Sequence, residues 1–417
     1  MAPNDGSAGT SIDFDSPPAI GNSRGVGRRS LLVGGAALLA GGAALAKPAR
    51  ALGAGPTGGA TGAAIDGVTG AASAKSEPGP FGLSPEQQAG QRVIWSYPGL
   101  TPPPALFDAI RAGLVGGVIF FGENINRNDR SQIQAVTGQL AQAQADSGIG
   151  YPLLLMTDQE GGVVQRLPGA PGVSEKQVGA SADPVGAARS AGVGAAQNLL
   201  DAGMNCNLAP VLDVYRQAGN FDDQFGRSYS MDPAVCGVCG AASITAQQEL
   251  GVVTTAKHFP GLGAATRAQN TDLGTATLNV SSSDLRRVDE FPFTHAVQAN
   301  VDMVMMSWAT YPALDPNLPA GLSPRIVLEL RGRLRFRGVT ITDAIEAGAL
   351  QNFGDTGERA VAAAAAGMDI VLCSARDVGQ GQDAVDALQA AIANGQLDSG
   401  LGADALQRVL ALRGRLG

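Results

Sequence analysis

Histidine and charged residues are scarce in this sequence. Only two of the 417 residues are histidines, His258 and His295, so a metal site built from several imidazole ligands is excluded. Charged residues make up 16% of the chain, against roughly 25% in typical globular proteins. The 29 basic and 37 acidic residues give a net charge of −8. This balance argues against nucleic-acid binding, which normally requires a basic face, and we expect neither a metal nor a cofactor.

Cysteine is also sparse, with Cys206, Cys236, Cys239 and Cys373. Cys236 and Cys239 have the spacing of a redox motif or of half a metal site, but no second pair of ligands accompanies them. The residues around them are typical of a helix, in which positions i and i+3 share one face. We therefore expect two small buried thiols.

The first 51 residues have the pattern of an export signal. Arg28 and Arg29 form a twin-arginine pair, an apolar run follows, and residues 44–46 (ALA) form a cleavage site of small residues. The apolar run is shorter than the roughly 20 residues of a spanning helix, which favours cleavage. Retention as a membrane anchor is the alternative, and only then would the protein contact a membrane. We predict a secreted or cell-surface protein, in which disulfides are permitted.

The rest of the chain divides into a linker and one folded domain. Residues 52–80 are rich in glycine and alanine. Such a segment buries too little apolar surface to offset the entropy lost on ordering, so we predict a flexible linker. Hydrophobic residues make up 44% of the chain, enough for a large core. We assign that core to a single domain over residues 81–417.

Short apolar runs alternate with helical stretches throughout this domain. Alternation of this kind predicts parallel strands joined by crossover helices. Eight such units close into a (β/α)8 barrel of the TIM type; an open doubly wound sheet is the alternative. The predicted strands are residues 92–96, 117–121, 153–157, 205–209, 252–256, 303–306, 339–342 and 370–372.

Helix signals lie between these strands. Asp183 is placed to cap a helix that begins at Pro184, where a missing N–H costs nothing. Residues 283–288 open another helix, and residues 360–366 form an alanine-rich one. His295 is interpreted as an ordinary helix residue.

Polar side chains follow several predicted strands. Barrel enzymes place their chemistry at the carboxyl ends of the strands. Several charged groups at one rim are costly unless they bind something polar, although a structural ring of ion pairs is the alternative. The side chains in question are Asp158, Asp213, Lys257, His258, Ser307 and Asp343.

Two carboxylates among these residues stand out. Asp343 ends a buried apolar strand before the small Ala344, which leaves room for a substrate. Capping of the following helix is the alternative role, and Glu346 lies at capping-box spacing. Asp158 is followed by glycines at 161 and 162, so the backbone can turn sharply and Arg166 can fold back toward the rim. A mutual Asp158–Arg166 ion pair is the alternative.

Cations accompany these carboxylates. Lys257 and His258 precede a rigid Phe-Pro step and are placed to donate hydrogen bonds to sugar hydroxyls, although Lys257 alternatively neutralises nearby carboxylates. Arg227 ends a loop that carries Asp222 and Asp223 and is alternatively paired with them.

These motifs together resemble glycoside hydrolase family 3, specifically its single-barrel bacterial β-N-acetylglucosaminidases. The resemblance implies that Asp343 is the nucleophile of a retaining glycosidase. It also implies that Asp158, Arg166, Arg227, Lys257 and His258 bind the sugar hydroxyls. The similar stretches are residues 116–121 (GGVIFF), 157–162 (TDQEGG), 165–166 (QR), 208–213 (LAPVLD), 226–229 (GRSY), 257–261 (KHFPG), 336–339 (FRGV) and 342–343 (TD).

The sequence departs from this family at the acid/base. In the family's N-acetylglucosaminidases an Asp-Ser-His in the loop after KHFPG supplies that group, whereas this chain has Ala268, Gln269 and Asn270 there. Asp272 is the nearest carboxylate in the loop, and we expect it, rather than Glu346, to transfer the proton. A glycan-binding barrel that has lost catalysis is the alternative function. A metal-dependent barrel hydrolase is disfavoured because the rim has only one usable histidine.

Overall fold

The computed structural model of the chain describes residues 80–416. The predicted export signal and, apart from Pro80, the predicted linker lie outside these residues. None of the helices in the described part is long and apolar enough to cross a membrane.

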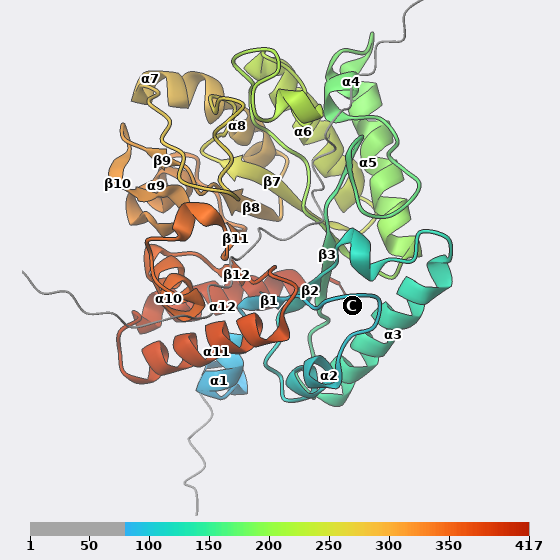
Figure 1. Cartoon of the computed structure of the whole chain (residues 1–417), viewed down its shortest axis with the longest axis vertical. Helices are drawn as coiled ribbons and strands as arrows, with labels where there is room; N and C mark the ends of the chain where they lie inside the picture. The colour runs from blue at the N-terminus through green and yellow to red at the C-terminus, as the bar shows by residue number, and fades with distance from the viewer. Residues whose placement is uncertain (1–79, 417) are drawn as a thin grey trace, which may run out of the picture. The chain divides into compact units, whose positions relative to one another are not determined.

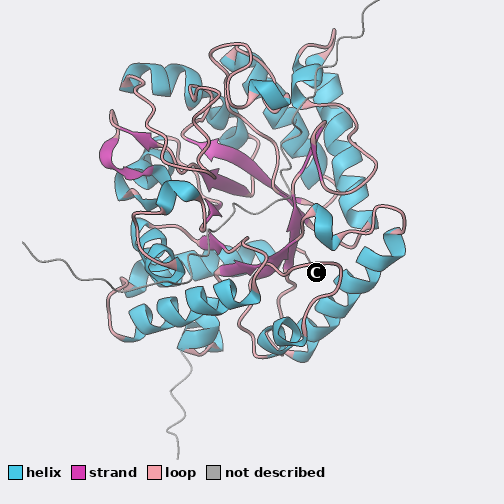
Figure 2. Ribbon diagram, in the orientation of Figure 1, coloured by secondary structure: helices cyan, strands magenta, loops and turns pink. Residues whose placement is uncertain are grey.

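Eight parallel strands close into a barrel, as the sequence predicts (Figures 1 and 2). The first strand pairs with both the second and the last, so the open-sheet alternative is wrong. Around the barrel the strands are β1 (Val93–Trp95), β2 (Gly117–Ile119), β3 (Leu154–Thr157), β6 (Cys206–Asn207), β7 (Val253–Phe259), β8 (Met303–Met306), β11 (Val339–Ala344) and β12 (Ile370–Leu372).

Helices surround the barrel (Figure 2). The longer ones are α2 (Pro104–Arg111), α3 (Arg130–Asp146), α5 (Pro184–Asp201), α6 (Pro233–Gln248), α8 (Phe291–Gln298), α10 (Thr356–Ala366), α11 (Val378–Ala393) and α12 (Ser399–Arg413). The shorter ones are α1 (Pro85–Gly90), α4 (Glu175–Gly179), α7 (Ser282–Asp284) and α9 (Pro324–Leu328).

Helix ends follow local chemistry. The Asp183 carboxylate caps α5 by accepting from the Gly186 N–H, 3.0 Å away, as the sequence predicts. The alanine run lies in α10, which ends at Gly367 in the left-handed conformation (φ 99°). The helix predicted over residues 283–288 starts earlier, because Ser281 caps α7 and the chain then continues as a π-helical turn over Leu285–Asp289.

The core forms on both sides of the strands, because successive strand residues point to opposite faces. Ile94 faces the barrel interior with Ile119, Met156 and Ile341, whereas Val93 and Trp95 pack outward against the helices. All four cysteines are buried and free of disulfides. Cys236 and Cys239 lie together on α6, as predicted, and His295 lies within α8 against Phe291.

Two hairpins extend the loops after β3 and β8. They are β4 (Gln159–Gly161) with β5 (Val164–Gln165), and β9 (Thr310–Tyr311) with β10 (Asp315–Pro319). The first hairpin returns the chain toward Asp158, and the Arg166 N–H donates to the Asp158 carbonyl at 3.3 Å. This fold brings Arg166 back to the rim.

Candidate active site

The predicted site residues meet at the carboxyl ends of the strands. Asp158 follows β3, and Lys257 and His258 lie near the end of β7. Asp343 lies near the end of β11. The remaining members come from loops: Arg166 follows β5, Arg227 follows β6 and Asp272 follows β7.

Glu160 is a central member of the cluster that the sequence analysis did not single out. It is buried on β4, and its carboxylate accepts two hydrogen bonds from Arg227, through Nε and Nη2, each 2.8 Å long. The Lys257 Nζ lies 2.8 Å from the same carboxylate and 2.7 Å from the Asp158 carboxylate. The signal for Glu160 was its place beside two glycines in the TDQEGG stretch, but its partners lie 67 residues and more away in sequence.

The charges in this cluster balance. Burial alone would raise the pKa of Glu160, but Arg227 and Lys257 outweigh it and hold that pKa well below its usual range. The pKa of Asp158 is also lowered, because Lys257 and Arg166 outweigh its desolvation. Two ionised carboxylates therefore face two buried cations, so the ion pairs of the structural alternative are present at the rim. Arg227 binds Glu160 bidentately and also lies 3.9 Å from Asp222, so the alternative pairing with Asp222 is present but is the weaker of the two.

His258 is held by Asp213. Its Nδ1 lies 2.7 Å from the Asp213 carboxylate, which also accepts the Leu262 N–H at 2.6 Å. Burial alone would lower the pKa of His258, but Asp213, and to a smaller extent Asp343, raise it overall. Asp213 thus orients the imidazole and anchors the start of the loop after β7. Ser307, the other rim residue, is buried and accepts from the Tyr311 hydroxyl at 3.1 Å.

Asp343 is partly accessible at the rim. Its Oδ1 accepts the N–H of the next residue, Ala344, at 2.7 Å. The Ala344 carbonyl in turn accepts the indole N–H of buried Trp308 at 2.8 Å. The carboxylate is therefore fixed in orientation while the residue remains open to a ligand.

Asp272 lies beside the segment that follows Asp343. Its carbonyl accepts the Gly348 N–H, and the carbonyl of Thr271 accepts the Ala349 N–H, both at 2.9 Å. Asp272 is accessible to solvent, yet surrounding protein and the Asp343 charge raise the pKa of its carboxyl to about 6, against the opposing charges of Arg227 and His258. The two carboxyl groups are thus electrostatically linked across the rim.

Glu346 does not form the capping box that its spacing predicts. Its carboxylate instead accepts hydrogen bonds from Ser374 Oγ at 2.6 Å and Gln380 Nε2 at 3.0 Å. No helix begins directly before it, so there is no N-terminus for it to cap. Because both oxygens already accept hydrogen bonds, Glu346 is poorly placed to transfer a proton.

Asp222 is a buried carboxyl at the back of the site. Neither of its oxygens has a hydrogen-bond partner among the described residues. Burial and the neighbouring Asp213 raise its pKa to about 7. Within residues 80–416 no three His, Cys, Asp or Glu side chains form a group that could hold a metal ion.

A closed (β/α)8 barrel with carboxylates and cations at the carboxyl ends of its strands is the architecture of barrel glycosidases. Residues 101–412 match the glycosyl hydrolase family 3 N terminal domain, and the chain belongs to this glycosidase family.

Individual relatives agree with this assignment. The chain is 46% identical over 330 residues to an uncharacterized secreted glycosyl hydrolase of Arthroderma benhamiae, covering 79% of this chain and 93% of that protein. It is 34% identical to a β-hexosaminidase of Stenotrophomonas maltophilia, covering 64% and 78%. A family 3 β-N-acetylglucosaminidase structure from Paenibacillus superposes with a TM-score of 0.75 at 33% identity; the match covers 80% of this chain and 63% of that one.

Proposed function

We propose that this protein is an exported glycosidase that removes β-linked N-acetylglucosamine or a related hexoside with retention of configuration. Asp343 acts as the nucleophile and Asp272 as the acid/base. The observation that carries the proposal is the place of these two carboxyl groups at the open rim, where desolvation first and the Asp343 charge second raise the pKa of Asp272 to about 6. Retaining glycosidases need such a pair, one group ionised and the other able to hold a proton.

The reaction follows from these roles. Asp272 donates its proton to the glycosidic oxygen while an Asp343 oxygen attacks the anomeric carbon and the leaving group departs. The resulting glycosyl ester is then attacked by water, whose proton passes to the Asp272 carboxylate. Free Asp343 and a sugar of unchanged configuration result, so each carboxyl group returns to its starting state.

The buried cations Lys257 and Arg227 bind the sugar. Lys257 and Arg227 are held by Glu160, and Lys257 also by Asp158, so their remaining N–H donors are fixed before the sugar arrives. Asp158 accepts from sugar hydroxyls, and Arg166 and His258 add donors at the same rim. Fixed donors and acceptors of this kind cost little entropy on binding and position the anomeric carbon.

The substrate class rests on the relatives. The Stenotrophomonas relative is named a β-hexosaminidase and the Paenibacillus structure a β-N-acetylglucosaminidase, and both exceed 30% identity to this chain. The name of the Arthroderma relative includes secretion, which supports export of this chain. Cell-wall glycan is the substrate that we propose for an exported enzyme of this class.

The test compares two substrates in two variants. Turnover of an aryl β-N-acetylglucosaminide and of an N-acetylglucosamine disaccharide is measured for Asp343→Asn and Asp272→Asn. The first variant should lose both activities. The second should lose about 10²–10⁴-fold on the disaccharide and much less on the aryl substrate, whose leaving group needs no proton.

A matched control removes a carboxylate of the same type elsewhere. Asp108→Asn changes an exposed aspartate that pairs with Arg111 on α2, 3.2 Å away, and should leave both activities intact. Full disaccharide turnover in Asp272→Asn would refute the acid/base assignment. Sugar binding without turnover of either substrate by the unmodified protein would favour the glycan-binding alternative.

A further inference from the structure

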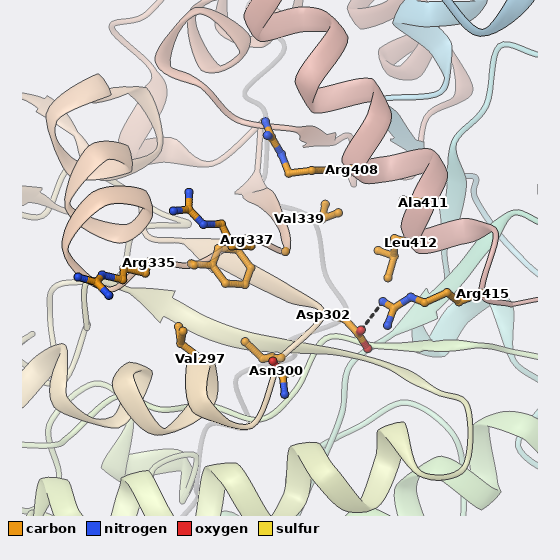
Figure 3. Close-up of a pocket in the computed structure, with 13 residues that line it drawn as sticks. Val297, Asn300, Asp302, Arg335, Arg337, Val339, Arg408, Ala411, Leu412 and Arg415 are labelled. Atoms are coloured by element: carbon orange, nitrogen blue, oxygen red, sulfur yellow. Dashed lines mark hydrogen bonds and ion pairs between the residues drawn. The ribbon is translucent and has the colours of Figure 1, made fainter.

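A cavity lies at the opposite end of the barrel from the candidate active site, and Figure 3 shows the residues that line it. Asp302 and Gly338, which line it, directly precede β8 and β11, so it lies at the amino-terminal ends of the strands. Its volume is about 350 Å³. That is within the range of small-molecule sites and several times the size of a single inorganic anion.

The charge of this cavity is opposite to that of the chain. Four arginines and a single aspartate line it, in a protein whose net charge is −8. Arg408 and Arg415 come from α12 and the residues after it, whereas Arg335 and Arg337 come from the loop before β11. Figure 3 shows Arg335 and Arg337 on one side of the cavity and Arg408 on α12, with Arg415 beside Asp302.

The carboxylates near the cavity already form ion pairs and hydrogen bonds with other residues. Asp302 lies 2.5 Å from Arg415 and accepts the Thr254 N–H at 3.3 Å. Asp369, behind the cavity wall, accepts from Arg331 at 2.5 Å, from Arg408 at 2.8 Å and from the Thr340 N–H at 2.8 Å. Among residues 80–416, therefore, no carboxylate forms an ion pair with the other two arginines.

Arg335 and Arg337 have no compensating partner. Neither side chain forms a hydrogen bond or ion pair with any residue among 80–416. Two of the cavity arginines repel a buried neighbour: burial lowers the pKa of Arg331, Asp369 opposes this, and the charges of Arg408 and Arg337 lower it further. An anion in the cavity would relieve this repulsion and would fit the planar fork of each guanidinium.

The remaining wall is apolar. Val301, Phe336, Val339 and Leu412 line it between the arginines. A bare anion would leave this surface and most of the volume unfilled, whereas the carbon skeleton of an ester would cover it. We propose that the cavity binds a phosphate ester about as large as a phosphorylated monosaccharide, with Arg335 and Arg337 as the anion-binding side chains. This inference does not depend on the proposed glycosidase function.

The test is calorimetric titration of the full folded chain with glucose 6-phosphate, inorganic phosphate and glucose. Glucose 6-phosphate should bind at least tenfold more tightly than inorganic phosphate, and glucose should not bind. The double variant Arg335→Gln/Arg337→Gln should weaken glucose 6-phosphate at least tenfold. Both residues are exposed and unpaired, so its thermal unfolding midpoint should stay unchanged. Arg337→Lys keeps the positive charge but loses the planar guanidinium that binds an anion through two N–H groups. It should therefore retain part of the affinity for glucose 6-phosphate.

The matched control is Arg286→Gln/Arg287→Gln. It removes the same charge from arginines that pair with Glu329 and Asp284 away from the cavity, and should leave glucose 6-phosphate affinity unchanged. Absence of glucose 6-phosphate binding, or equal loss in both double variants, would overturn the site. Equal affinity for inorganic phosphate would overturn the assignment to an ester.

Discussion

The Gly348 N–H donates a 2.9 Å hydrogen bond to the carbonyl of Asp272. This bond joins the loop after β7, which carries the proposed acid/base, to the segment that follows the proposed nucleophile on β11. The spacing of the two carboxyl groups thereby depends on backbone contacts between residues 76 and 78 positions apart in the sequence (348 − 272 and 349 − 271).

Gly348→Ala should disturb the junction directly. A Cβ at this position would lie 2.5 Å from the Leu273 carbonyl carbon and 2.9 Å from the Asp272 oxygen, so the loop must shift. A shift of about 1 Å is enough to lower kcat by roughly 10²-fold. Because the atoms met are backbone, the variant should also lose some folding stability, which urea denaturation measures separately. Gly138→Ala is the control, because nothing lies near its Cβ on α3. Undiminished kcat in Gly348→Ala would show that the junction does not position Asp272.

The pH dependence should report the Asp272 proton. Because its pKa is raised to about 6, the carboxyl holds its proton below that pH and loses it above. Turnover of the disaccharide should therefore fall as pH rises through about 6, whereas that of the aryl substrate should fall less. A disaccharide profile that stays flat between pH 5 and 8 would contradict this role.

Glu160→Gln should destabilise the protein strongly. It leaves Arg227 and Lys257 without their buried carboxylate, and breaking a buried pair costs about 3–5 kcal/mol of unfolding free energy. Urea denaturation measures this cost. Glu249→Gln, which breaks the exposed pair with Arg189, should cost less than about 1 kcal/mol. Similar losses in the two variants would mean that Glu160 has no special structural role.

The lowered pKa of Glu160 predicts how the stability of the protein changes in acid. The pKa of Glu160 is lower in the folded protein than the unfolded value of 4.5, so its ionised form favours folding. This contribution is complete above the unfolded pKa and is lost as pH falls below it. The difference in stability between Glu160→Gln and the parent should therefore shrink in acid.

The export prediction can be tested in cells. Replacing Arg28 and Arg29 with lysine should retain the protein in the cytoplasm, because the twin-arginine pair is the recognised feature. Arg24→Lys is the control and should leave export unchanged. Cell fractionation with an antibody measures both, and normal secretion of the double variant would rule out the twin-arginine route.

The fold could be predicted from the sequence because its signals are local. Alternating apolar runs and helix caps such as Asp183 depend on residues that are close in sequence, and all eight strands appear where these signals place them. The observed ends of two elements differ from the predicted ends. β7 continues through Lys257 to Phe259, and Ser281 begins α7 before the predicted start.

The pairing within the site could not be predicted in the same way. Glu160 reaches Arg227 only because the β4–β5 hairpin places it beneath the rim. Gly161 and Gly162 indicate that the chain turns there, but the local sequence does not specify which distant cation Glu160 meets. Glu346 has the spacing of a cap but finds Ser374 and Gln380, because the chain turns before any helix begins. The local sequence predicts which polar residues lie at the rim. The conformations of the loops determine which of these residues contact one another.

The most direct measurement is the mass of the enzyme during slow turnover of an activated β-N-acetylglucosaminide, followed by peptide mapping. The account predicts a covalent sugar adduct on the peptide that contains Asp343, absent in Asp343→Asn, and a product of unchanged anomeric configuration. An adduct on another residue, or an inverted product with no adduct, would contradict it.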